Sequence, residues 1–332
     1  MDARLMQQSS NDACIYIQQS RVVNTLEQDV RQGLLKPPRS LPPKYFYDET
    51  GSRLFDQICD TPEYYPTRTE SAMLDLWACE IIDRASPSHI LEFGSGTSRK
   101  TRHLIDACQT MDLLCEYLPF DVCEEMLLEV RECFDTDYPW LNISPLVGDY
   151  TAGLQHLHRP KNNCMYVFLG SSIGNFTREE AQVFMREVRV CMQPGDTLLL
   201  GVDRVKDPAV LHRAYNDAQG MTAQFNLNLL QVLNQRLQAD FDVDAFVHQA
   251  NFNLDEERIE MYLVSTQQQR IELQALGEKL NLQANEKLLT EISQKYTYEG
   301  AEQLFTQAGL SIREHYQADN GYFSLILGEY KE

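Results

Sequence analysis

The middle of the chain alternates short apolar runs with longer amphipathic stretches. Helical patterns at 99–110, 123–134 and 178–192 separate the runs, and a further one extends from Thr69 to a break at Pro87. The apolar runs that we interpret as strands cover residues 89–93, 115–121, 142–148, 163–170 and 196–203. Strands that alternate with helices at this spacing predict a parallel, doubly wound α/β sheet.

This rhythm stops after Val202. Residues 207–240 are predicted to be helical, whereas residues 246–265 and 270–282 alternate as antiparallel strands do. The end of the chain predicts a helix, a strand, a turn and a strand, which would add an antiparallel hairpin to a mixed sheet. We therefore expect a sheet domain formed by residues 65–205 and 296–332, and a second, α+β domain formed by residues 13–64 and 206–295.

The N-terminal part is harder to assign. Residues 13–35 are predicted to be helical with polar faces, and the prolines of "KPPRSLPPK" predict an extended connector. The next segment, "LPPKYFYDETGSRLFDQICDTPEYYPTRTE" at 41–70, is rich in aromatic residues but has no clear helical or strand period. Its aromatic side chains belong either to a core or to a substrate pocket under a lid over the strand ends.

Composition and charge narrow the functions that need to be considered. The 332 residues are 43% hydrophobic and 23% charged, as in ordinary globular proteins, and no apolar run is long enough to span a membrane. The N-terminus has no secretory signal pattern, so we expect a cytoplasmic protein. A net charge of −20 disfavours binding to nucleic acid or to anionic membranes and favours a small-molecule partner.

The nine cysteines occur without a CxxC pair or any zinc-type spacing. We expect reduced thiols and no metal site.

One glycine motif has the context of a nucleotide-type site. In "HILEFGSGTSRKT" a predicted strand precedes Gly94-Ser95-Gly96 and a predicted helix follows it. A dinucleotide fingerprint would have a third glycine where this chain has Arg99, and Glu92 lies just before the turn. These departures disfavour NAD and FAD and fit the first motif of S-adenosylmethionine-dependent methyltransferases.

Three later strand ends agree with that cofactor. Asp121 ends the second apolar run, where a carboxylate can accept hydrogen bonds from ribose hydroxyls. Asp149 follows the third run and suits the adenine amino group, with Tyr150 packing beside it. The fourth run ends in "VFLGSSIGN", at the edge where the reactive methyl would emerge. A glycine pair and scattered acids also arise by chance in α/β proteins, but four such features in order favour a methyltransferase.

Six motifs in register resemble the histidine-specific Nα-methyltransferase family of ergothioneine biosynthesis. The resemblance extends from about residue 15 to 330. It rests on the segment 41–70 quoted above and on "LEFGSGTSRKT", "FLGSSIGNF", "LHRAYNDAQGMTAQFNLNLL", "RIEMYL" and "TEISQKY". It implies a class I, Rossmann-like methyltransferase fold with a second, substrate-binding domain. The implied activity is the trimethylation of the α-amino group of L-histidine by S-adenosylmethionine, which gives hercynine.

The resemblance also implies a set of site residues. It assigns the substrate carboxylate to Asn175 and Tyr215, and the imidazole to Glu291 and Ser293. The remaining substrate-binding residues that it implies are Tyr47, Phe55, Tyr64, Gly170 and Met261. The cofactor-binding residues that it implies are Tyr64, Gly94, Ser95, Lys100, Asp121, Asp149 and Tyr150. Tyr47 is our candidate for the catalytic group that takes the proton of the amine.

Less specific interpretations of these residues remain open. Glu291 could be a helix-cap or surface acid, Asn175 could cap the helix that opens near Thr177, and Met261 and Phe55 could be core residues. Two alternative functions also remain: a family member that methylates another amino acid or an aromatic amine, and a non-catalytic protein that retained the fold. We expect a monomer because no strongly apolar helix face is left unassigned.

Overall fold

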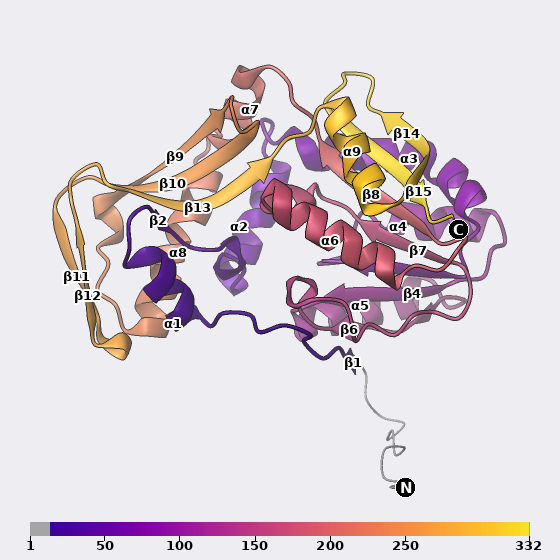
Figure 1. Ribbon diagram of the computed structural model, residues 1–332, viewed down its shortest axis with the longest axis horizontal. Coiled ribbons are helices and arrows are strands. Elements are labelled where there is room, and N and C mark those ends of the chain that lie inside the picture. Colours follow the sequence, from indigo (N-terminus) through magenta and orange to yellow (C-terminus); the bar gives the residue numbers. More distant parts are fainter. Residues whose placement is uncertain (1–13, 332) are drawn as a thin grey trace, which may run out of the picture.

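The computed structural model describes residues 14–331. Within them, a large sheet has the strand order β1-β6-β4-β3-β7-β8-β15-β14, with β5 beside β4 (Figure 1). Neighbouring strands are parallel except at β8, β15 and β14, which pair antiparallel. The strands are β1 (Ile15–Tyr16), β3 (His89–Phe93), β4 (Glu116–Asp121), β5 (Asn142–Ile143), β6 (Leu146–Val147), β7 (Cys164–Phe168), β8 (Thr197–Asp203), β14 (Ser311–Gln317) and β15 (Phe323–Glu329).

Helices cover both faces of this sheet. One face packs on α3 (Tyr65–Ala85), α4 (Arg102–Thr110) and α5 (Glu124–Asp137), and the other on α6 (Arg178–Cys191) and α9 (Tyr298–Ala308). Every residue of β7 and β8 is buried, which explains why these strands are continuous apolar runs. The predicted fold class, a mostly parallel sheet with an antiparallel C-terminal hairpin, is confirmed.

A second sheet lies beside the first, with the order β2-β13-β10-β9 (Figure 1). Its strands are β2 (Arg39–Ser40), β9 (Phe246–Asn253), β10 (Arg258–Ser265) and β13 (Lys287–Gln294), and a separate hairpin pairs β11 (Gln269–Leu273) with β12 (Glu278–Leu282). The helices of this part are α1 (Leu26–Asp29), α2 (Glu49–Asp60), α7 (Pro208–Tyr215) and α8 (Met221–Leu237). The domain boundaries given above stay a prediction.

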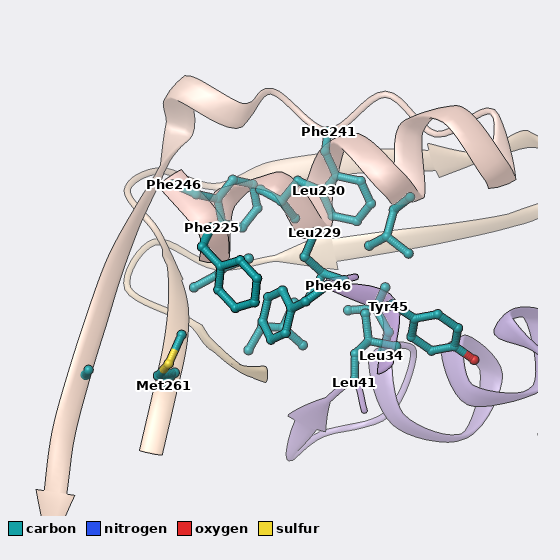
Figure 2. Close-up of a cluster of buried hydrophobic side chains, with 14 of the residues drawn as sticks. Leu34, Leu41, Tyr45, Phe46, Phe225, Leu229, Leu230, Phe241, Phe246 and Met261 are labelled. Carbon is teal, nitrogen blue, oxygen red and sulfur yellow. The ribbon is translucent and has the colours of Figure 1, made fainter. Parts of the chain in front are cut away.

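A separate hydrophobic core holds this second sheet to its helices. Figure 2 shows side chains from the N-terminal segment meeting those of α8. Phe46 is fully buried and stacks on Phe225 with ring centroids 4.6 Å apart. Tyr45 is also buried, and its hydroxyl donates to Asp29 at 2.6 Å. Part of the aromatic segment at 41–70 therefore belongs to a core.

The prediction of a helix over 13–35 is wrong for most of its length. Residue 13 lies outside the described residues, and Ile15–Tyr16 forms β1, which pairs with β6 at the sheet edge. Only Leu26–Asp29 is α-helical, followed by a π-helical turn at Val30–Leu34. None of residues 15–24 is buried, so backbone pairing with an open sheet edge outweighs their weak helical propensity. The helical part begins where apolar side chains are buried, at Leu26, Val30 and Leu34.

Three smaller differences concern one helix that was not predicted and the boundaries of two other elements. The segment at 41–70 contains α2, which its aperiodic composition did not predict; Asp48 caps this helix by accepting from the Gly51 amide at 2.7 Å. Helix α3 begins at Tyr65 rather than at Thr69. The run at 142–148 is divided into β5 and β6 by Ser144 and Pro145, because proline removes a backbone donor.

The segment between β8 and α9 leaves the large sheet and returns to it at the same place. Tyr296 donates its backbone amide to the Asp203 carbonyl at 3.0 Å, and Val205 donates to the Tyr296 carbonyl at 3.0 Å. The ends of β8 and β13 are therefore neighbours, although about ninety residues separate them in sequence. Among the described residues, no helix is both long and apolar enough to cross a membrane.

Candidate active site

A pocket opens at the carboxyl ends of β7 and β8, the edge at which α/β sheets bind ligands. Side chains from the N-terminal segment, the loop after β7, the end of α7 and strand β13 line it. The lining residues are Tyr47, Phe55, Tyr64, Pro66, Gly170, Ser171, Ser172, Asn175, Asp203, Tyr215, Glu291, Ser293 and Lys295. All the predicted substrate-binding residues except Met261 are thereby brought together.

Strand β13 presents an acid, a hydroxyl and a cation to the pocket. Glu291, Ser293 and Lys295 alternate along the strand and its end, and all three line the pocket, as the two-residue period of a strand requires. No described residue forms a hydrogen bond with the half-buried Glu291 carboxylate. Desolvation, partly offset by the positive charge of Lys295, raises the pKa of Glu291 to about 7. The helix-cap and surface alternatives for Glu291 are therefore wrong.

The raised pKa predicts that Glu291 destabilises the ligand-free fold. Since the folded pKa of about 7 exceeds the ordinary 4.5, the folded chain retains a proton that the unfolded chain loses, and stability falls as pH rises from 4.5 to 7. Glu291→Gln should raise the free energy of unfolding by about 1–3 kcal/mol at pH 8 and by much less at pH 4.5. Denaturant unfolding at both pH values measures this, and an equal effect at both would contradict it.

Asp203, at the end of β8, is a fully buried hub. The Tyr65 hydroxyl donates to it at 2.7 Å, the Lys295 ammonium lies 2.8 Å from its Oδ2, and Lys206 forms a second ion pair with it. Burial acts to raise the pKa of Asp203, but Lys295 and Lys206 together outweigh it and lower this pKa. The hub ties α3, β8 and β13 together beneath the pocket.

Lys295 joins this hub to two predicted substrate-binding residues. Its Nζ donates to the Tyr215 hydroxyl at 2.8 Å and to Ser293 Oγ at 2.8 Å, and the Tyr215 hydroxyl donates to Ser293 Oγ at 2.9 Å. Sequence reasoning missed both Lys295 and Asp203. The available signals were a lysine two residues beyond Ser293 on the same strand face, and an acid ending a wholly apolar strand.

Aromatic rings form a continuous row along the pocket. The ring centroids of Tyr47 and Phe55 are 5.8 Å apart, those of Phe55 and Tyr64 6.3 Å, and those of Tyr64 and Tyr215 6.0 Å, all in edge-on contacts. Such faces attract a methylated ammonium without a directional hydrogen bond. Of the aromatic residues in the segment at 41–70, Tyr47, Phe55 and Tyr64 therefore line the pocket, whereas Tyr45 and Phe46 belong to the core.

The loop after β7 contributes Gly170 and Asn175. Gly170 has φ +79°, a left-handed conformation that glycine favours, and its amide donates to the buried Glu70 carboxylate at 2.9 Å. Helix α6 is capped by Thr177, which exchanges hydrogen bonds with Glu180 in a capping box, so the alternative role of Asn175 as that cap is wrong. Asn175 lines the pocket instead.

Met261 lies beside the pocket rather than in its wall. It is buried in the second core, where Figure 2 shows it, and it pairs with Glu291 across β10 and β13. It is absent from the lining residues. Its contact is thus with the strand that carries Glu291.

The glycine turn after β3 has an open backbone. Gly94 and Gly96 have φ of +63° and +49°, and a Cβ at Gly96 would meet no atom within 4 Å. The Gly96 amide donates to Asp121 Oδ2 at 3.0 Å, which places that carboxylate beside the turn. Ser95 is buried, and its hydroxyl has no partner in the described part of the chain. An open turn, an acid and an orphaned hydroxyl fit a cofactor with hydroxyl and amine groups.

The other predicted cofactor residues lie on the same edge. Within the described residues, Asp149 accepts hydrogen bonds through Oδ1 alone, from the Thr151 amide and hydroxyl. Tyr150 follows it in sequence, and a Cβ at Gly94 would lie 3.4 Å from the Tyr150 ring. Lys100 forms an ion pair with Glu70, which also holds the Gly170 amide. One buried acid therefore links the cofactor side of the site to the loop that lines the substrate pocket.

Comparison with known proteins decides between the classes of enzyme that this geometry allows. The sequence model of the family described as "Histidine-specific methyltransferase, SAM-dependent" matches residues 26–330. The chain belongs to that family. The predicted resemblance is confirmed, and the class of a non-catalytic relative finds no support.

Several relatives of this methyltransferase are named for a reaction or for a pathway. The histidine N-alpha-methyltransferase of Mycolicibacterium smegmatis is 44% identical over 94% of this chain and 97% of its own length. Ergothioneine biosynthesis protein 1 of Neurospora crassa is 31% identical over 96% of this chain, which spans 37% of that longer protein. A 4-dimethylallyltryptophan N-methyltransferase of Arthroderma benhamiae is 28% identical over 89% of this chain and 90% of its own length.

Proposed function

We propose that this enzyme transfers methyl groups from S-adenosylmethionine to the α-amino group of L-histidine, giving hercynine for ergothioneine biosynthesis. The observation that carries this proposal is the Glu291 carboxylate, which no residue of the described chain pairs with, and Ser293 beside it on the same strand face. A half-buried acceptor next to a hydroxyl matches a ring with two nitrogens. A substrate without a ring N–H would leave the carboxylate unpaired, which costs several kcal/mol in comparable sites.

The pocket residues divide the substrate among them. Asn175 and Tyr215 would bind the α-carboxylate, and Glu291 and Ser293 the imidazole. Phe55 and Tyr64 would form the apolar wall, with Gly170 at the loop edge. Met261 would act only through the position of β13, because it pairs with Glu291 but does not line the pocket.

Tyr47 is proposed to orient the amine. The residue is 46% exposed, yet desolvation of its hydroxyl, and next the charge of Glu291, raise the pKa of Tyr47 well above its ordinary value. The phenol therefore stays protonated near neutral pH and does not act as a phenolate base. Its oxygen can accept a hydrogen bond from the amine and so direct the nitrogen lone pair, which methyl transfer needs in line with the reacting carbon.

The cofactor site is proposed to consist of the edge residues described above. S-adenosylmethionine would supply an activated methyl group on a sulfonium, so the reaction needs no metal. Asp121 would accept hydrogen bonds from the ribose hydroxyls, and Asp149 would accept one from the adenine amino group through its remaining oxygen. Lys100 would face the carboxylate of the cofactor. Gly94, Ser95, Tyr150 and Tyr64 would complete this site.

Side-by-side turnover of L-histidine, L-tryptophan and histamine tests the proposal. We expect methyl uptake by histidine to exceed that by the other two amines by at least about a hundredfold in kcat/KM. Methylation of another amine without uptake by histidine would refute the assignment of substrate. That outcome would favour the alternative of a different amino acid or aromatic amine, a reaction class for which the 28% identical fungal relative is named.

We further propose that the enzyme acts as a cytoplasmic monomer on free histidine. Its net charge of −20 disfavours nucleic acid and membrane surfaces as partners. Light scattering of the purified chain would test the monomer.

A further inference from the structure

The buried hub beneath the pocket contains more positive than negative charge. Among residues 14–331, Asp203 is the one acid in direct contact with both Lys206 and Lys295, and the third partner of Asp203 is the neutral phenol of Tyr65. The side chains of Asp203 and Lys295 are fully buried, and that of Lys206 is 5% exposed. Two ammonium groups on one carboxylate give a net charge of +1 that water screens weakly.

The two lysines differ in what they face. Lys206 contacts Asp203 and Tyr65 and lies outside the pocket wall, whereas Lys295 is part of that wall. Since Lys206 neutralises Asp203, the charge of Lys295 remains available to the pocket. Burial, outweighing the attraction of Asp203, lowers the pKa of Lys206 to about 8, and Lys295 adds to that lowering, as two cations sharing one acid require.

Lys295 reaches the pocket through Tyr215. An ammonium only donates hydrogen bonds, and the three N–H groups of Lys295 are directed to Asp203, Tyr215 and Ser293. Tyr215 therefore accepts from Lys295, and it donates its one hydroxyl hydrogen to Ser293 Oγ at 2.9 Å. An anion in the pocket would compete with Ser293 for that hydrogen, and the contact with Lys295 makes the Tyr215 hydroxyl a stronger donor to it. The wall contains one further acid besides Asp203: Glu291, whose carboxylate repels an anion.

We propose that Lys295 is the positioning residue that makes this site require a free α-carboxylate, and that Lys206 is needed because it leaves the charge of Lys295 uncompensated. The inference rests on the proposed function and narrows its substrate class to free amino acids. Amines that lack the carboxylate, and amino acids whose carboxyl group is an amide or a peptide bond, would place no anion against Tyr215. The repulsion from Glu291 explains why an added cation is required.

Calorimetric binding of L-histidine and L-histidinamide, with the demethylated cofactor present, tests this proposal. The two ligands share the amine and the ring and differ in the carboxylate. We expect the intact protein to favour histidine by about a hundredfold. Lys295→Met should reduce this ratio at least about tenfold, and Lys206→Met should reduce it several-fold although it alters no residue of the pocket wall.

Arg204→Met is the matched control. Arg204 also lies just after β8 and is partly buried, but its guanidinium donates to Tyr296 and Ser324 rather than to Asp203. Its removal takes away one positive charge beside the hub and should leave the ratio unchanged. If Arg204→Met and Lys206→Met lowered the ratio of histidine to histidinamide affinity equally, the loss of any nearby positive charge would explain the effect, and the proposal would be overturned.

Two further outcomes would also overturn it. One is an equal loss of affinity for histidine and for histidinamide in Lys295→Met, which is what a structural role of Lys295 predicts. The other is a ratio of the two affinities near one in the intact protein.

Cofactor binding reports whether each variant is folded. If Lys295→Met does not fold, the comparison of Lys206→Met with Arg204→Met decides the question. Methyl transfer to histidine is measured first; should another amino acid be the substrate, that amino acid and its amide replace the ligand pair, so the two proposals fail separately.

Discussion

Replacement of Glu291 by alanine is expected to raise the KM for L-histidine by about a hundredfold, with less than a twofold change in the affinity for S-adenosylmethionine. The carboxylate has no hydrogen-bond partner in residues 14–331, and it lines the pocket on the strand of the second sheet. Its removal takes away the acceptor for a ring N–H but leaves the cofactor edge intact. Steady-state kinetics and calorimetric titration of the two ligands measure both quantities.

Glu291→Gln is the matched control for shape. It keeps the size of the side chain and one acceptor oxygen but loses the negative charge, so its KM should lie between those of the intact protein and Glu291→Ala. The same variant should gain stability above pH 7, for the reason given above. Equal weakening of histidine and cofactor by Glu291→Ala would show that this residue holds the fold and does not select the ring.

Replacement of Asp121 by alanine should have the opposite selectivity. Its carboxylate ends β4 and fixes the glycine turn through the Gly96 amide, at 3.0 Å, and it also accepts from the Cys123 amide, at 3.1 Å. Loss of these contacts and of the proposed ribose contacts should weaken cofactor binding by about a hundredfold. Histidine affinity at saturating cofactor should change by less than about threefold, because Asp121 is not part of the pocket wall.

Asp121→Asn separates charge from shape in this test. It retains an acceptor for the turn and should weaken cofactor binding less than the alanine variant. A cofactor affinity that stays unchanged in Asp121→Ala would remove this residue from the proposed site. Calorimetric titration of the demethylated cofactor gives the affinity without turnover.

The large sheet was predictable because strands that are buried on both faces are continuous apolar runs in the sequence. β7 and β8 are apolar throughout, and the glycine turn after β3 marks the ligand edge. The first 35 residues were not predictable in this way, since β1 exists only through pairing with β6 and has two exposed residues. Helix α2 was missed because Phe55 and its neighbours serve the pocket as well as the core, which blurs the helical period.

The site was predictable as far as each side chain has a role of its own. Glu291, Asn175 and Tyr215 were predicted from motifs, and the structure places all three around one pocket. Lys295 was not, because a lysine near the end of a polar strand is usually solvated. Its role depends on Asp203, which is 92 positions earlier in the chain, and no local pattern connects the two.

The place at which the chain leaves the large sheet after β8 and returns after β13 has an evolutionary consequence. Both ends of the segment that carries Tyr215, Glu291 and Ser293 meet at the bridge between Arg204 and Tyr296. A segment whose two ends are neighbours in space can change in sequence, or be replaced by another segment, without a change in the strand pairing of the sheet that it interrupts. Selection for a new amine can therefore act on this insertion while the glycine turn and its acids stay under separate constraint, so the fold is well suited to acquiring new substrates.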